Sequence, residues 1–170
     1  MKARGNLQGG LGCLAIVLLA ASLAAAQSVA ELQKRFDNET SAVHKAKLLE
    51  KLGDAQFEEA RRAEKTGDNN TVDSTLEKYR DNVHAALDAL KKQHPDAEKH
   101  SNGYRQLEIH LRKGIREVEE ATLAAPEPYK PPLQLVRADL VAMDEGMLRL
   151  LFPHRPADQR PPTPPAEKQP

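Results

Sequence analysis

Apolar residues recur three or four positions apart through most of this chain, which is the period of an α-helix. The most regular stretch lies between positions 72 and 90. There the spacing alternates between four and three, as in a coiled-coil seam, at Val72, Leu76, Tyr79, Val83, Ala86 or Leu87, and Leu90. This pattern predicts a long helix that buries one face.

A second helix is predicted from Ala42 to Thr66, where one stripe collects small and apolar residues at Ala46, Leu49, Leu52, Gly53, Phe57, Ala60 and Ala63. Before it, Ser28 to Asp37 forms a short amphipathic segment with Val29, Leu32 and Phe36 on one side. We expect a short leading helix there, with Thr40 or Ser41 capping the long helix that follows.

Short breaks separate the predicted helices. Gly67 can adopt the left-handed conformation that ends a helix, and Asn70 or Thr71 is expected to cap the next one. His94-Pro95 ends that helix, because the residue before a proline disfavours helical angles. Two helices joined by such a short turn are predicted to run antiparallel.

The C-terminal half repeats the pattern. Tyr104, Leu107, Leu111, Ile115 and Val118 predict a helix that reaches about Leu123. Gly114 inside it either permits close packing or marks a weak point, since glycine costs about 1 kcal/mol there relative to alanine. The segment AAPEPYKPP interrupts the pattern, and a further helix, with Pro132 in its first turn, continues to Phe152 on the seam Leu133, Val136, Leu140, Met143, Met147 and Leu150.

The predicted fold is therefore all-α, an antiparallel helical bundle of four main helices plus a short leading helix, over residues 27–153. The last residues, 154–170, are rich in proline and poor in apolar side chains. Such a composition cannot offset the entropy of ordering, so we expect a disordered proline-rich C-terminal tail.

The first 26 residues have the features of a secretory signal peptide. Lys2 and Arg4 precede an apolar stretch from Leu11 to Leu23, and Ala24-Ala25-Ala26 provides a small-residue cleavage site. Cys13 lies at the start of the apolar stretch rather than after it, so we do not expect lipidation. We expect export to the periplasm or the medium, with no stable membrane span after cleavage.

Charge excludes some partners. The whole chain has 25 basic and 25 acidic residues; the signal peptide holds two of the basic ones, so 23 and 25 remain and the formal charge becomes −2. No strong overall field attracts nucleic acid, and we expect no nucleic-acid partner. The remaining chain has no cysteine, which leaves no disulfide and no thiol nucleophile.

No catalytic, cofactor-binding or metal-binding residue is predicted. The sequence lacks H-E-x-x-H, G-x-S-x-G, G-x-G-x-x-G and the P-loop pattern. The best metal-ligand candidate is the cluster His94, Asp96, Glu98 and His100, for which a polar connection is the simpler interpretation.

Two surface features stand out. Arg105, Arg112 and Arg116 lie close to one flank of a helix, a pattern that suits an anionic partner, although Glu108 is placed to pair with Arg112. At the end of the last helix, Leu148, Leu151 and Phe152 add apolar faces to the seam. They predict either burial inside the bundle or contact with a protein partner or a second copy of the chain.

The stretch from Gly53 to Tyr79 resembles one tetratricopeptide hairpin when Gly67-Asp68 is aligned with the usual turn of that repeat. Ala63, Val72 and Tyr79 depart from the residues typical of the repeat, and residues 87–120 hold no second copy. Because a repeat groove needs several stacked units, this resemblance implies a single hairpin.

The domain as a whole resembles uncharacterised exported all-helical proteins of environmental bacteria, through KLGDAQFEEARRA, LEKYRDNV, LEIHLRKGIRE and LLFP. That resemblance implies export and a helical fold, and it carries no catalytic residue. Two functions are expected from the sequence. One is a non-enzymatic interaction or structural module of the cell envelope; the other is a ligand-binding or enzymatic domain with a site near Arg105, His110 and Arg112.

Overall fold

The computed structural model describes residues 29–153, which form an all-α fold without strands in that range. After a leading helical segment at 29–38 come α2 (Ala42–Thr66), α3 (Asn69–Gln93), α4 (Ser101–Ala124), the 3₁₀ turn η1 (Glu127–Tyr129) and α5 (Lys130–Leu151). The predicted fold class and helix count are confirmed. The predicted signal peptide and proline-rich tail lie outside the described residues.

The turn between α2 and α3 forms largely as predicted. Gly67 has φ 73°, and its N–H donates to the carbonyl oxygens of the last turn of α2, so α2 ends in a left-handed cap. The cap of α3 was predicted at Asn70 or Thr71 and is wrong by two or three positions. Asp68 is the cap, since its carboxylate accepts from the backbone N–H of Thr71 at 3.1 Å and from its hydroxyl at 2.7 Å.

The other helix ends follow the predicted signals. Ser41 caps α2 by accepting from the N–H of His44 at 3.4 Å, and α3 ends at Gln93, just before His94-Pro95. The last two helices each begin two to three residues before the predicted starts, at Ser101 and Lys130.

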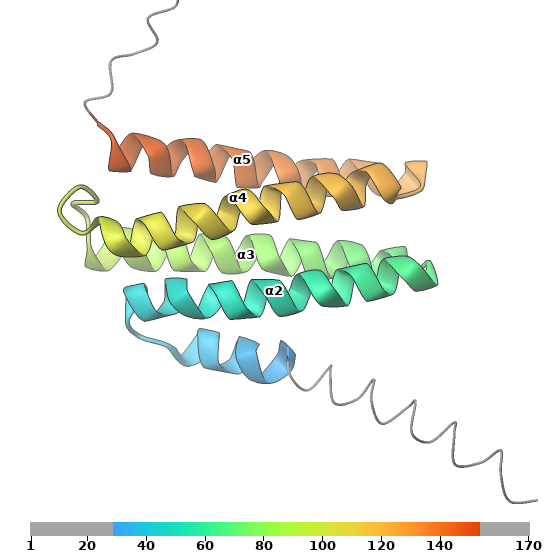
Figure 1. The fold of residues 1–170 in the computed structure, drawn as a ribbon, viewed down its shortest axis with the longest axis horizontal. Helices are drawn as coiled ribbons and strands as arrows, with labels where there is room; N and C mark the ends of the chain where they lie inside the picture. The colour runs from blue at the N-terminus through green and yellow to red at the C-terminus, as the bar shows by residue number, and fades with distance from the viewer. Residues whose placement is uncertain (1–28, 154–170) are drawn as a thin grey trace, which may run out of the picture.

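The four long helices alternate in direction, so α2 and α4 run parallel to each other and antiparallel to α3 and α5 (Figure 1). Around the bundle the order is α2, α3, α5, α4, with α3 and α4 also in contact across the centre. The leading segment packs beside α2 through Phe36, which is buried. Its Gln33 side chain also exchanges two hydrogen bonds, of 2.9 and 3.0 Å, with the buried Asn82 amide of α3.

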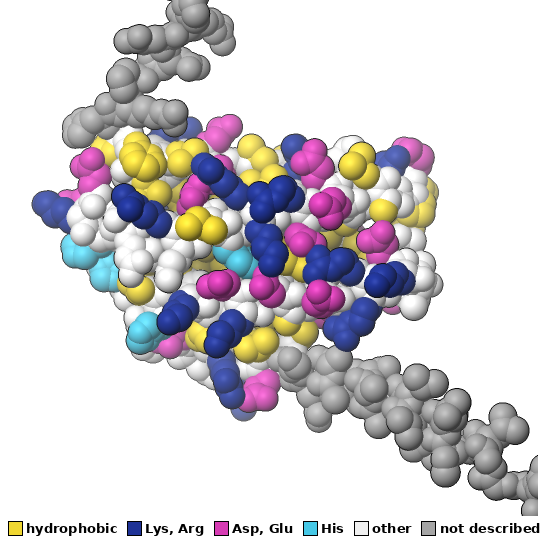
Figure 2. All heavy atoms as spheres, in the orientation of Figure 1, with side chains coloured by type: hydrophobic (Ala, Val, Ile, Leu, Met, Phe, Trp, Pro, Cys, Tyr) yellow, Lys and Arg dark blue, Asp and Glu magenta, His cyan; other side chains and the backbone are white. Residues whose placement is uncertain are grey.

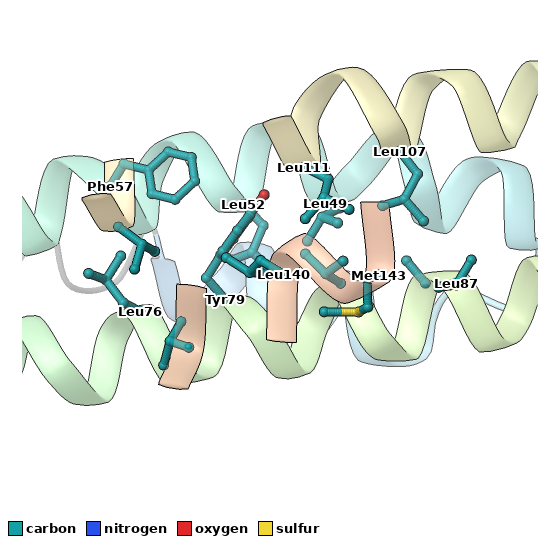
Figure 3. Packing of buried hydrophobic residues seen from close by; sticks show 14 of the residues in the cluster. Leu49, Leu52, Phe57, Leu76, Tyr79, Leu87, Leu107, Leu111, Leu140 and Met143 are labelled. Atoms are coloured by element: carbon teal, nitrogen blue, oxygen red, sulfur yellow. The ribbon is translucent and has the colours of Figure 1, made fainter. Parts of the chain in front are cut away.

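The predicted apolar seams make up the core. Every seam residue of α3 is buried, and on α5 only Leu150 is less than fully buried. Figure 3 shows side chains of all four helices in this cluster, among them Leu52 of α2, Tyr79 of α3, Leu111 of α4 and Leu140 of α5. Within residues 29–153, no helix combines the length and apolar character needed to cross a bilayer.

Gly67 and Gly146 allow a direct test of the left-handed cap. A Cβ added at either position would meet no atom within 4 Å, but only Gly67 has a positive φ. We expect Gly67→Ala to lower the free energy of unfolding by about 1 kcal/mol, because a side chain resists this conformation. Gly146→Ala is the matched control and should raise it by up to about 1 kcal/mol. Urea denaturation measures both, and equal effects of the two substitutions would contradict the cap.

Candidate functional site

The predicted basic patch lies on the outward side of α4. Arg105, Arg112 and Arg116 are all exposed, and at 100° per residue they fall within a narrow stripe that also holds Ile109 and Leu123. Those two aliphatic side chains are unusually open, with 68% and 78% of their surface exposed. We call these five residues the α4 stripe. Its arginines were predicted from the sequence, but its two apolar members were not, because they lie outside the apolar seam of the helix and face away from the core.

The arginines of the stripe differ in their partners. Arg112 pairs with Glu108 at 2.5 Å, as the spacing predicted, and lies 3.6 Å from Asp144 of α5. Within residues 29–153, Arg105 and Arg116 have no carboxylate within ion-pair distance. Two of the three guanidinium groups are therefore open to an anionic partner.

The predicted apolar contact at the end of α5 divides between core and surface. Leu151 is buried in the bundle, Leu148 is half-buried, and Phe152 is 47% exposed. Leu151 thus serves the core, and Phe152 alone of the three presents a large apolar surface.

The sequence predicted a site near Arg105, His110 and Arg112, but His110 faces the interior of the bundle. It lies roughly 140° around the helix from Arg105 and is 5% exposed, whereas Arg105 and Arg112 point outward. The structure therefore does not bring His110 together with these two arginines. Its neighbours are Asp54 of α2, Tyr79 of α3 and Lys113 of α4.

These side chains form a chain of hydrogen bonds through the centre of the bundle. The Tyr79 hydroxyl lies 3.1 Å from both Nδ1 and the carbonyl oxygen of His110. On the other side of the ring, Nε2 lies 3.2 Å from the Asp54 carboxylate, which also accepts from Lys113 Nζ at 2.7 Å. The network ties three helices together: Tyr79 and His110 are buried, whereas the Asp54 and Lys113 side chains are 50% and 41% exposed.

The pairing assigns the proton of the imidazole. Asp54 offers only acceptors, so Nε2 carries the hydrogen, and Nδ1 shares the Tyr79 hydroxyl hydrogen with the His110 carbonyl oxygen. Burial lowers the pKa of His110, which keeps the ring neutral although Asp54 favours its charged form. Burial of Asp54 opposes ionisation, but the hydrogen bonds from Lys113 and His110 outweigh it and lower the pKa of that carboxyl. Burial raises the pKa of Tyr79, so the phenol stays a hydrogen-bond donor.

Two glycines make room for the rings. A Cβ on Gly114 would overlap the Tyr79 ring, and a Cβ on Gly53 would overlap the His110 ring. The Phe57 ring completes the cluster, stacked on His110 at 5.8 Å and tilted against Tyr79 at 4.6 Å between centroids. Gly114 therefore permits close packing, which was one of the two alternatives that the sequence left open.

A cavity of about 330 Å³ opens between α2 and α4 beside this network. We call it the α2–α4 cavity. Figure 2 shows this face of the molecule, with acidic side chains in a row along α2 and basic ones gathered over α4. The lining residues are Glu50, Asp54, Gln106, Ile109, His110, Lys113 and Arg116.

The candidate metal cluster in the connection after α3 has other partners. The His94 and His100 rings stack with centroids 5.1 Å apart, and Asp96 pairs with Lys99 at 3.0 Å. In the part of the chain that the structure describes, no three His, Cys, Asp or Glu side chains are placed to hold a metal ion.

Comparisons with protein-family models, curated proteins and solved structures find no match to this chain.

Packing around Tyr79 predicts an unusual effect at Gly114. Gly114→Ala adds helix propensity worth about 1 kcal/mol, yet its Cβ would overlap the Tyr79 ring. We expect a net loss of about 1–3 kcal/mol in the free energy of unfolding, because the rigid ring is enclosed by three helices. Chemical denaturation measures the loss, with Gly146→Ala as the unobstructed control. A stabilised Gly114→Ala protein would show that the helices separate easily here.

The neutral His110 predicts a stability that falls in acid. Its pKa is lowered in the fold, so the unfolded chain takes up a proton first as the pH drops below about 6.5. Stability from this group is complete above that pH and is lost as the pH falls from there towards the lowered pKa of the folded state. The pKa of Asp54 is also lowered, but from 3.8, so its contribution is lost only at more acidic pH.

The test compares the wild type with His110→Gln, which cannot titrate. Urea denaturation at about pH 7.5, 6.5 and 5.5, at constant ionic strength, should show the stability advantage of the wild type shrinking as the pH falls. An advantage that grows in acid would mean that the imidazolium is the preferred form in the fold.

Proposed function

We propose that this chain is an exported, non-enzymatic helical module of the cell envelope that binds a protein partner through the α4 stripe. The observation that supports this most directly is the alignment of Ile109 and Leu123 with three exposed arginines on one face. Single exposed aliphatic residues are common on protein surfaces. An apolar pair in line with arginines is typical of a binding surface, since arginine is enriched at interfaces.

The stripe has the dimensions of a helix-binding face. Ile109 and Leu123 lie about 21 Å apart along the axis of α4, a length that a partner helix of similar size would span. Because Arg105 and Arg116 have no ion-pair partner within residues 29–153, carboxylates of a partner could approach them without displacing one. The expected partner segment is an amphipathic helix with acidic residues opposite the arginines and apolar residues opposite Ile109 and Leu123.

Charge distribution favours a protein over a lipid surface. Glu119 and Glu120 are exposed on α4 just before Leu123, so the end of the stripe is acidic. A plane of anionic headgroups would meet these carboxylates as well as the arginines. A protein partner can match both signs along the same helix.

The interior supports a non-enzymatic role. The phenol and the imidazole of the polar network are buried, and burial raises the pKa of Tyr79. The His110 ring contacts Phe57 and Tyr79, and both of its nitrogens are used in hydrogen bonds within the bundle. This network is suited to holding three helices in register.

Site-specific photocrosslinking in the source cells tests the proposal. A photoreactive residue at Ile109 or Leu123 should give the same adduct, and one at the exposed Ala85 of α3 should not. The adduct should fall at least about tenfold in Arg105→Glu, because a guanidinium that meets a carboxylate is replaced by a like charge. Mass spectrometry should place the crosslink in an acidic amphipathic helix.

Three results would overturn the proposal. One is an equal adduct at Ala85, and another is an adduct that Arg105→Glu leaves unchanged. The third is binding of the purified protein to phosphatidylglycerol vesicles but not to the synthetic helix identified by the crosslink. Recovery of the crosslink when the partner's acidic residue is changed to arginine would confirm the pairing directly.

A further inference from the structure

The α2–α4 cavity is a second candidate site, which shares Ile109 and Arg116 with the α4 stripe. Its volume of about 330 Å³ lies at the lower end of the roughly 300–1,000 Å³ of small-molecule sites. The lining carries two carboxylates, Glu50 and Asp54, and two cations, Lys113 and Arg116, beside the neutral His110. A lining of zero net charge with separated positive and negative groups complements a ligand that is itself dipolar.

The charges in the middle of the cavity already satisfy each other. Asp54 receives the Lys113 ammonium at 2.7 Å and the His110 ring at 3.2 Å. Glu50 and Arg116 remain, and neither has an opposite charge within ion-pair distance in residues 29–153. These two groups are therefore available to a ligand.

Glu50 and Arg116 lie at opposite ends of the cavity. Because α2 and α4 run parallel and Asp54 contacts His110 and Lys113, these residues mark one level of the bundle. Glu50 precedes that level by one turn of α2, and Arg116 follows it by about one turn of α4. The backbone levels of the two groups are roughly 10 Å apart along the axis at 1.5 Å per residue.

A free-ended tripeptide matches this separation. Extended chain spans at most about 3.3–3.6 Å per residue, so the ends of three residues lie about 10 Å apart. Gln106 lies one turn before His110, at about the level of Glu50, so its side-chain oxygen can accept from the amino end of the peptide, while Ile109 offers apolar contact on the outer side.

We propose that the α2–α4 cavity binds a short peptide with free termini, its ammonium group at Glu50 and its carboxylate at Arg116. Lys113 and His110 hold Asp54 in place, which keeps the middle of the cavity neutral. Arg116 is suited to the carboxylate because a guanidinium can donate two parallel hydrogen bonds. This site goes beyond the proposed protein-binding role of the α4 stripe.

The probe is trialanine, with three matched relatives that are N-acetylated, C-amidated or blocked at both ends. Titration into the purified full chain, followed by ¹H–¹⁵N NMR, should give saturable shifts at α2 and α4 with a Kd of about 1 mM or below. Each single block should weaken binding at least about tenfold, and the double block should abolish it. Absence of saturable shifts up to about 10 mM trialanine, or equal binding of the blocked peptides, would overturn the proposal.

Two substitutions assign the ends. In Glu50→Gln the N-acetylated peptide should bind as well as trialanine, because the group that recognises the ammonium is gone. In Arg116→Gln the C-amidated peptide should bind as well as trialanine, because the group that recognises the carboxylate is gone. If either variant keeps the full wild-type discrimination, the assigned orientation is wrong and the proposal fails.

The controls separate this site from the α4 stripe. Glu77→Gln on α3 and Arg105→Gln on the stripe alter exposed charges outside the cavity and should leave trialanine binding unchanged. Glu50→Gln should in turn leave the crosslink from Leu123 unchanged. Loss of trialanine binding in Arg105→Gln would place the peptide on the stripe and overturn the cavity assignment.

Discussion

The close approach of α2, α3 and α4 around Tyr79 and His110 fixes how these helices are rotated and therefore which residues each face of the bundle presents. The Tyr79 and His110 rings occupy the space that Gly53 and Gly114 leave free, and the Phe57 ring packs against both. Their polar atoms are satisfied only in this arrangement, because the hydroxyl, the ring and the Asp54 carboxylate belong to three different helices. A rotation or shift of any one helix would leave a buried polar group without a partner, at a cost of about 1–3 kcal/mol.

This interior arrangement also determines the surface. Once His110 is directed at Tyr79 and Asp54, the rotation of α4 is set, and Arg105, Ile109, Arg112 and Leu123 must face outward. The same contact brings α2 beside α4 with Glu50 and Arg116 bordering one cavity. The two proposed binding surfaces are thus consequences of one buried network, although neither uses the network for chemistry.

Local signals predicted the helices well, because they act within a few residues. Gly67 ends α2 through a conformation that other residues resist, and the prolines begin α5 where a missing N–H costs nothing. The cap of α3 was placed too late, since Asp68, Asn70 and Thr71 can all act as caps. Asp68 acts as the cap because the left-handed conformation of Gly67 has already reversed the chain there, and the Asp68 N–H donates to the Ala63 carbonyl oxygen.

The helical period was enough to predict the fold class, the approximate extent of each helix and the rows of residues that form the core, since it reveals which positions share a face. It also placed three arginines on one flank of α4. The packing of the helices against one another was needed to show that His110 points away from those arginines, that Leu151 is buried while Phe152 is not, and that Asp54 and Lys113 meet. The physical reason is that periodicity describes one helix at a time. Distances between side chains on different helices depend on how closely and at what rotation the helices pack, which here is set by two glycines and the rings between them.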